Sequence, residues 1–415
     1  MARNRLAEVL FGPARRGPAP PARPPARRVE PATPARVTAL EPFEADPGAP
    51  AAPGVAQLRI VRAISDGEPV FGVSGHCCCA DLPYHAPGEY GRPGLSLGTL
   101  MSREAAAGGA PPAKTLHWMR GWSESKRPLV GWLNRLRRVH GDRLRLIIWD
   151  DTDFDIPWEL LWLPGEPGDG VRGGWLGAEV AVSRRTTLHG PAARPAARCS
   201  GEVVGFVDES DLEIAGDLPI LRDLGMRTFP SFRDLVSYLE EAGAPPSLVY
   251  VACHGSYSVD GFEFTLGELP LGELNGRVLR RLAGTDGLVF LNACHSGRLI
   301  IEERFNDKTL RGFAKVFLAS GAAGLIGTAA EVGTRSAREA ARTLIRRLRD
   351  EPGTPVAVAL RDYRRSLAPD DVPPVRDVAA NQALLQFMYA FVYIYYGDPH
   401  STVRLVPAAG KGGAT

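Results

Sequence analysis

The stretch GLVFLNACHSG, residues 287–297, decides the fold. Its four consecutive apolar residues, 288–291, predict a short strand that is buried on both faces. Similar apolar runs occur at 202–207, 248–253 and 323–328. Helical apolar spacing separates these runs, so we expect an α/β fold with a mostly parallel sheet flanked by helices.

Three details of the helix and strand pattern can be compared with a structure. Ser231 precedes an apolar stripe that starts at Phe232, which predicts an N-capped helix. Ser336 and Glu339 have the spacing of a capping box before another helix. The apolar run 388–396 predicts a last strand.

Composition divides the chain into four parts. Residues 1–55 hold 12 of the 36 prolines, and the first 36 residues hold eight arginines and two glutamates. This composition is typical of a disordered basic tail, which serves as a solvated linker or, alternatively, contacts nucleic acid or acidic lipid. We expect an N-terminal subdomain over 56–195, a catalytic α/β domain over 196–405 and a flexible C-terminus over 406–415.

Charge and cysteine content narrow the class of protein. The formal net charge is only +2, so we expect the folded part to bind no nucleic acid. The longest apolar run, 383–396, is too short to span a bilayer, so we expect no membrane association. Six unevenly spaced cysteines give no disulfide framework, which favours a cytoplasmic protein.

Two predicted strands end in reactive residues. The strand at 248–253 continues into His254 and Gly255, and the strand at 288–292 leads to Cys294. Because the carboxyl ends of neighbouring parallel strands share one edge, the imidazole and the thiol are expected to lie side by side. Such a pair can activate a cysteine nucleophile, and the amides of Gly255 and Cys294 are placed to bind an oxyanion.

These motifs resemble those of a known family. The His-Gly pair, the NACHSG motif at 292–297, the IPWELL segment at 156–161 and the terminal YGDP at 396–399 are similar to a CHAT domain. CHAT domains are a bacterial branch of the caspase, gingipain and separase superfamily of cysteine peptidases. The resemblance covers about residues 140–405 and implies a caspase-like sheet, with Cys294 as nucleophile and His254 as general acid and base.

The same resemblance suggests a substrate preference. In the superfamily, the pocket for the residue before the cut is walled by the loop after the first strand and by the strand after the nucleophile. Acidic residues stand there in this chain, namely Asp208, Glu209, Asp211 and Glu331. We expect Asp208 and Glu331 to bind substrate and cleavage to follow arginine or lysine. Arg184, Arg185, Arg194 and Arg198, expected in exposed linkers, are then candidate sites of self-cleavage.

Other interpretations of the same residues are weaker. Cys253 faces away from His254 by strand alternation and is expected in the core, and His295 is expected beside the site without acting in it. Three consecutive cysteines, 77–79, cannot converge on one ion, so we expect no metal. Nothing in the sequence points to a cofactor.

The leading hypothesis is a thiol protease, a cysteine endopeptidase that hydrolyses a protein substrate through an acyl-enzyme. By resemblance, a bacterial defence pathway, antiviral or leading to cell death, is its setting, with a regulatory or sensor protein as partner. The alternative is a non-catalytic adaptor that keeps the caspase-like fold to bind a partner protein. Acyl transfer to a small molecule by the same two residues also stays open.

Overall fold

A computed structural model describes residues 53–65, 68–77, 84–91, 112–150, 152, 155–166, 168, 170–186, 197–258, 263–283, 287–301, 310–369, 371–372 and 378–405. The predicted tail up to residue 52, the boundary near residue 195 and the C-terminus from 406 lie outside these residues. The domain boundaries therefore stay predictions.

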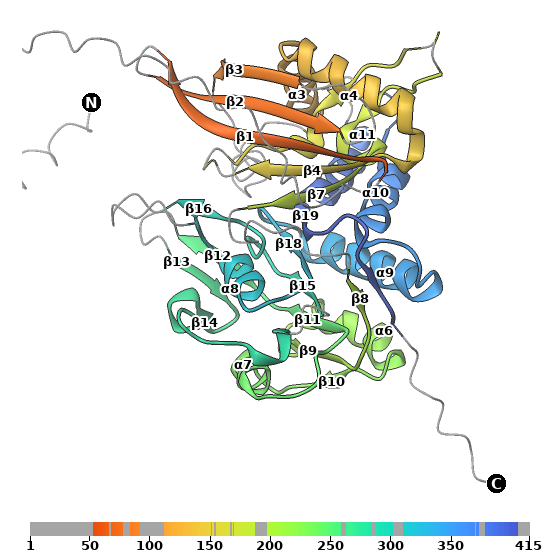
Figure 1. Cartoon of the computed structure of the whole chain (residues 1–415). Coiled ribbons are helices and arrows are strands. Elements are labelled where there is room, and N and C mark those ends of the chain that lie inside the picture. Colours follow the sequence, from red (N-terminus) through yellow and green to blue (C-terminus); the bar gives the residue numbers. More distant parts are fainter. Residues whose placement is uncertain are drawn as a thin grey trace, which may run out of the picture. The chain divides into compact units, whose positions relative to one another are not determined.

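Eleven strands form one sheet in the order β10-β9-β11-β15-β18-β19-β7-β4-β1-β2-β3 (Figure 1). The half that carries the reactive residues consists of β10 (Arg227–Thr228), β9 (Val203–Val207), β11 (Leu248–Ala252), β15 (Leu288–Asn292), β18 (Gly324–Thr328) and β19 (Tyr393–Gly397). The other half consists of β7 (Ala181–Arg185), β4 (Arg145–Asp150), β1 (Val55–Ser65), β2 (Glu68–Cys77) and β3 (Tyr84–Gly91). Only β18 with β19, β1 with β2 and β2 with β3 pair antiparallel, which confirms the predicted fold class.

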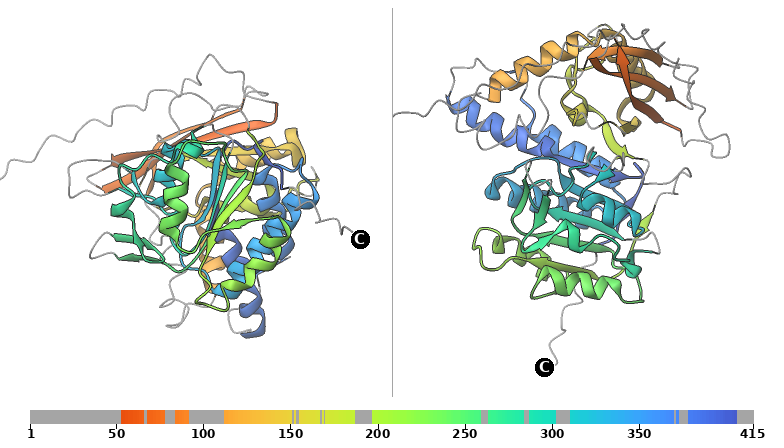
Figure 2. Two further views of the ribbon diagram at one scale, coloured as in Figure 1. Left: turned by 90° about the horizontal axis from the view of Figure 1, so that it is seen from below. Right: turned by 90° about the vertical axis from the view of Figure 1, so that its left-hand side faces the viewer.

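Helices lie on both sides of the sheet (Figure 2). They are α3 (Pro112–Glu124), α4 (Arg127–His140), α5 (Leu176–Glu179), α6 (Leu218–Asp223), α7 (Phe232–Glu240), α8 (Phe313–Ala319), α9 (Thr334–Asp350), α10 (Val356–Leu367) and α11 (Val378–Val392). Because both faces are covered, all five residues of β9, β11, β15 and β18 are buried. No helix within the described ranges is long and apolar enough to cross a membrane.

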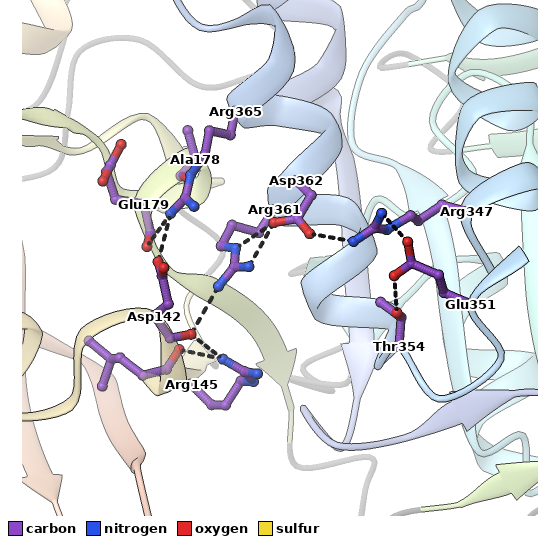
Figure 3. A network of polar contacts seen from close by, with 11 residues as sticks. Asp142, Arg145, Ala178, Glu179, Arg347, Glu351, Thr354, Arg361, Asp362 and Arg365 are labelled. Carbon is purple, nitrogen blue, oxygen red and sulfur yellow. Dashed lines mark hydrogen bonds and ion pairs between the residues drawn. The ribbon is translucent and has the colours of Figure 1, made fainter.

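The two halves of the sheet meet at β7 and β19, which pair in parallel. Arginines of helix α10 form hydrogen bonds that connect the two halves (Figure 3). Arg361 donates to the carbonyl of Asp142 at 3.0 Å, and Arg365 donates to the carbonyl of Ala178 at 2.9 Å. Arg347 of α9 contacts Asp362 of α10 at 3.4 Å. The sheet and this network join residues on both sides of the predicted boundary.

Two of the three detailed predictions are wrong at the level of single residues. Ser231 does cap α7, since its side chain accepts from the amide of Asp234. Helix α9 begins at Thr334 after Gly333, so Ser336 lies within the first turn and is not a cap. The run 388–396 is helical as far as Val392 and extended only from Tyr393.

The prediction that arginines lie in exposed linkers is wrong for Arg184 and Arg185. Arg184 and Arg185 lie in the buried strand β7, and Arg184 pairs with Glu159 at 2.5 Å. Arg198 is exposed in the two-residue strand β8 (Arg198–Cys199), and Arg194 lies outside the described residues. Self-cleavage at residues 184 and 185 is therefore excluded in the folded protein.

Candidate active site

Two neighbouring strands carry His254 and Cys294 to one edge of the sheet. Ala252 and Asn292 are paired across β11 and β15, and each reactive residue follows its strand two positions later. Both residues line one cavity of about 40 Å³, which we call the Cys294 cavity. Figure 1 shows β11 and β15 side by side at the centre of this half of the sheet.

The backbone around the thiol is closely packed. The Val332 amide donates to Sγ of Cys294 at 3.4 Å, and the thiol lies 3.6 Å from the Val332 carbonyl oxygen. At Gly255, a Cβ atom would overlap the carbonyl oxygen of Cys294. Glycine is therefore the residue that lets the two reactive segments approach each other.

His254 is held by a carboxylate. Its Nε2 lies 3.0 Å from Oδ2 of Asp211, while the other carboxylate oxygen accepts from the amides of Glu213 at 2.8 Å and Ile214 at 3.3 Å. These two amide bonds are the main reason that the pKa of Asp211 lies below its ordinary value. An ionised Asp211 fixes the proton on Nε2 and leaves Nδ1 as the ring nitrogen that can accept one.

A buried polar network lies beneath the thiol. Oδ2 of Asp217 accepts from the Tyr250 hydroxyl at 2.5 Å and from the Asn292 amide at 3.2 Å. The Tyr393 hydroxyl in turn donates to Oδ1 of the Asn292 side chain at 2.7 Å. Burial raises the pKa of Asp217 to about 6, against the lowering effect of the two hydrogen bonds that it accepts.

Cys253 and His295 are the sequence neighbours of His254 and Cys294. Both are buried, and burial changes the pKa of each. Cys253 is buried, as predicted, and burial raises the pKa of its thiol, so it stays protonated. His295 is also buried, with a φ of 59°, and burial and then Arg298 lower its pKa to about 4. Its imidazole is therefore neutral at neutral pH and is no proton donor there.

The other predicted site residues, Gly255, Asp208 and Glu331, do not line a common cavity. Gly255 lies against Cys294, as described above. Asp208 lines a second, larger cavity of about 760 Å³, which also reaches His254 but not Cys294. Glu331 is not among the residues that line either cavity. The roles of these residues stay predictions.

Sequence reasoning missed two carboxylates. Asp211 was expected in a substrate pocket and instead contacts His254, and Asp217 was not considered. The position of Asp211 just after β9 was an available signal, because the end of a strand next to β11 lies near His254. Asp217 gave no signal, since its partners Tyr250 and Asn292 are 33 and 75 residues away.

Metal-ligating side chains do not cluster within the described part of the chain, where no three of His, Cys, Asp or Glu could hold an ion together. Two members of the consecutive cysteine run, at positions 78 and 79, lie outside the described residues.

Comparison with known families gives one match. Residues 221–395 match the family model described as CHAT domain, which confirms the resemblance that the motifs indicate. The matched segment contains His254 and Cys294 and begins after Asp211 and Asp217. No curated protein matches the chain.

Solved structures match this chain at low sequence identity and low structural similarity. The separase of the Saccharomyces cerevisiae separase–securin complex has 12% identity and a TM-score of 0.37, over 61% of this chain and 15% of separase. This chain thus spans about a seventh of separase. The Arg specific cysteine proteinase gingipain R has 13% identity and a TM-score of 0.41, over 68% and 69% of the two chains. Its Porphyromonas gingivalis form, bound to its pro-domain, gives 12% identity and the same TM-score.

Proposed function

We propose that this chain is a cysteine endopeptidase in which Cys294 is the nucleophile, His254 the general acid and base, and Asp211 the residue that positions His254. One observation carries the proposal. Cys294 and His254 line the same cavity, and Nε2 of the imidazole already contacts the carboxylate of Asp211. A non-catalytic scaffold has no need of this arrangement.

The proposed reaction has two stages. Nδ1 of His254 takes the thiol proton, and the Cys294 thiolate forms a C–S bond to the peptide carbonyl carbon. The tetrahedral intermediate collapses as the C–N bond breaks and the imidazolium gives its proton to the leaving amine. Water, deprotonated by His254, then attacks the thioester, and the acid product and the free thiol are released.

The amide of Gly255 is the proposed first donor to the oxyanion of each intermediate. The amide of Gly267 donates to the carbonyl of His254, which makes these two residues a hydrogen-bonded pair between β12 (Gly255–Ser258) and β13 (Glu263–Leu266). Gly255 is next along the strand, in a non-hydrogen-bonded pair with Leu266, so its N–H points away from β13. The Cys294 amide is the proposed second donor.

The biological setting is part of the proposal and rests on the family. Cleavage of a protein substrate after arginine or lysine, in the cytoplasm and within a bacterial defence or cell-death pathway, is consistent with the CHAT match. A regulatory or sensor protein is the proposed partner.

Thiol labelling followed by peptide mapping tests the proposed function. Iodoacetamide should alkylate Cys294 well before the other five cysteines of the chain. His254→Ala should slow that reaction while thermal unfolding of the protein stays the same. Hydrolysis of fluorogenic peptides should be lost in Cys294→Ala. Uniform labelling of all accessible cysteines in the wild type would instead support the adaptor hypothesis.

A further inference from the structure

A second cavity adjoins His254 and takes no part in the proposed reaction. Its volume is about 760 Å³, and His254 is the one described residue that it shares with the Cys294 cavity. We call it the Phe229 cavity, after an aromatic residue that lines it. Pockets that bind ligands commonly have volumes of about 300–1,000 Å³, so this cavity is large enough for a substrate side chain.

One segment of the chain runs from the Phe229 cavity across His254 to the Cys294 cavity. Between β9 and α6, residues 208–210 line the Phe229 cavity, and Asp211 contacts Nε2 of His254 at 3.0 Å. Asp217, further along the same segment, lines the Cys294 cavity. The imidazole therefore lies between the two cavities.

The proposed reaction assigns each cavity to one side of the cleaved bond. Cys294 attacks the carbonyl carbon, so the residue before the bond lies next to the Cys294 cavity. His254 gives a proton to the leaving amine, so the residue after the bond begins beside the imidazole. Because the Phe229 cavity reaches His254 and not Cys294, it adjoins the side of the leaving amine.

We propose that the Phe229 cavity binds the side chain of the residue directly after the cleaved bond, and that this residue is arginine or lysine. This inference rests on the proposed function and adds to it the substrate class on the leaving side of the bond. It does not depend on which residue precedes the bond.

Apolar side chains form one part of the cavity. Phe206 and Val207, at the end of β9, are only 7% and 5% exposed. Phe229 and Pro230 follow β10 and line the same cavity. Arginine and lysine have long aliphatic stems that pack on such surfaces, and a guanidinium also stacks on aromatic rings. This part of the cavity therefore fits the stem of a basic side chain.

Three carboxylates form another part of the cavity. Asp208 and Glu209 follow β9, and Glu268 lies in the turn between β13 and β14 (Leu269–Pro270). The amide of Gly267 donates to the carbonyl of His254 at 2.7 Å, which holds this turn beside the imidazole. The carboxylates thus come from two segments that meet at the reactive histidine.

Charge complementarity favours a cation in this cavity. None of the described residues that line it is lysine or arginine, so a bound cation would meet three negative charges at neutral pH. Two arginines nearby already have partners. Arg233 lies near Glu268 but pairs with Glu273 at 2.5 Å, and Arg227 packs over the ring of Phe229 at 5.0 Å. An acidic residue after the cleaved bond would be repelled.

Iodoacetyl amides test the leaving side of the site without a residue before the bond. The probes are iodoacetyl-arginine amide, iodoacetyl-norleucine amide and iodoacetyl-glutamate amide. Each alkylates the thiolate, with formation of a C–S bond and loss of iodide. The amino acid is joined to the carbonyl through its amine, as the residue after the cleaved bond is in a substrate. Norleucine keeps an unbranched stem without the charge.

The rate constants for Cys294 are divided by those for mercaptoethanol, which removes differences in the intrinsic reactivity of the probes. In the wild type, we expect the arginine probe to react about 2- to 5-fold faster than the norleucine probe and about 5- to 30-fold faster than the glutamate probe, as exposed ion pairs allow. The ratio of arginine to norleucine should fall toward one as the ionic strength rises from about 0.05 to about 0.5 M, because salt screens exposed charges.

Variants assign the preference to the cavity. Glu268→Gln and Asp208→Asn should each lower the ratio of the arginine to the norleucine rate, and together they should bring it close to one. Phe229→Ala should slow both probes relative to iodoacetamide, because it removes apolar surface. Glu263 is exposed on β13 and lines neither cavity, so Glu263→Gln is the matched control and should leave the ratio unchanged.

The results separate this inference from the proposed function. If iodoacetamide alkylates Cys294 well before the other cysteines but the arginine and norleucine probes react at equal rates, only the inference is overturned. It is also overturned if Asp217→Asn removes the preference for arginine and Glu268→Gln does not, since the probe then occupies the Cys294 cavity. If iodoacetamide shows no preference for Cys294, the proposed function itself fails.

Discussion

Asp211 is the residue whose replacement tests most directly how His254 is held. Asp211→Asn keeps the size of the side chain and removes the charge beside Nε2, so the imidazolium formed during the reaction loses a stabilising partner. We expect kcat to fall by about 10- to 100-fold with little change in KM, because the carboxylate acts on the imidazole that moves the proton and not on bound substrate.

Asp223→Asn, at the C-terminal end of α6, is the matched control for this substitution. Its kcat and KM should equal those of the wild type. A rise in KM alone for Asp211→Asn would show that the carboxylate binds substrate and does not position His254.

Substitution of Gly255 by alanine adds one methyl group and provides a second test of the site. Gly255→Ala places a methyl group against the carbonyl of Cys294, and the backbone has to move to relieve the overlap. We expect alkylation of Cys294 by iodoacetamide to slow by at least about tenfold, because a displacement of about 1 Å at a reacting group has effects of that size or larger. Gly272→Ala is the control, since a methyl group there meets nothing within 4 Å. Equal alkylation rates for the two variants would contradict a functional close approach.

At the scale of elements, a buried ion pair fixes the 3-10 turn η2 (Trp158–Leu160) against β7. Glu159 is 2% exposed and Arg184 is 8% exposed, and Nη2 of the arginine lies 2.5 Å from the carboxylate. Removal of one partner leaves a buried charge, so we expect Glu159→Gln to lower the free energy of unfolding by about 3–5 kcal/mol. Urea denaturation measures this loss. Glu273→Gln, which breaks an exposed pair with Arg233, should leave the midpoint of urea denaturation almost unchanged.

The ion pair between Glu159 and Arg184 also predicts how the stability of the protein changes with pH. Burial acts to raise the pKa of Glu159, but the charge and hydrogen bonds of Arg184 prevail and lower it below 4.5. A carboxyl with a depressed pKa in the folded state stabilises the protein above its unfolded pKa and loses this contribution as the pH falls. The stability difference between wild type and Glu159→Gln should therefore shrink below about pH 4.5. A difference that is constant from neutral to acidic pH would contradict this account.

The sequence predicts some helices and strands more accurately than others. Buried strands such as β11 and β15 are predictable because a short run rich in valine and aromatic residues, with proline or glycine shortly before it, favours a strand. The strand predicted for the run from Met388 to Tyr396 is wrong up to Val392 and right from Tyr393, because an apolar run alone does not separate a buried helix from a buried strand. The reactive pair follows from strand order, whereas the position of Asp217 depends on long-range packing that leaves no local pattern.

At the scale of the whole molecule, the sheet itself predicts that the reactive half does not fold alone. Strand β19 is buried along its whole length between β18 and β7. A fragment that begins at residue 197 loses β7 and exposes one edge of β19, together with the apolar side chains that pack against α3, including those of α11. An exposed, hydrophobic strand edge of this kind favours aggregation. We expect this fragment to elute as aggregates in gel filtration and to show no cooperative thermal unfolding.

A fragment that begins at residue 53 is the matched control for this experiment. All eleven strands of the sheet start at Val55 or later, so the fragment keeps every one of them. Its unfolding temperature should lie within about 2 °C of that of the full chain, because the fragment retains every strand of the sheet. Iodoacetamide should also alkylate Cys294 at the same rate in both. A monomeric 197–415 fragment that unfolds cooperatively would show that the pairing of β7 with β19 is dispensable, and the reactive half would then be a domain in its own right.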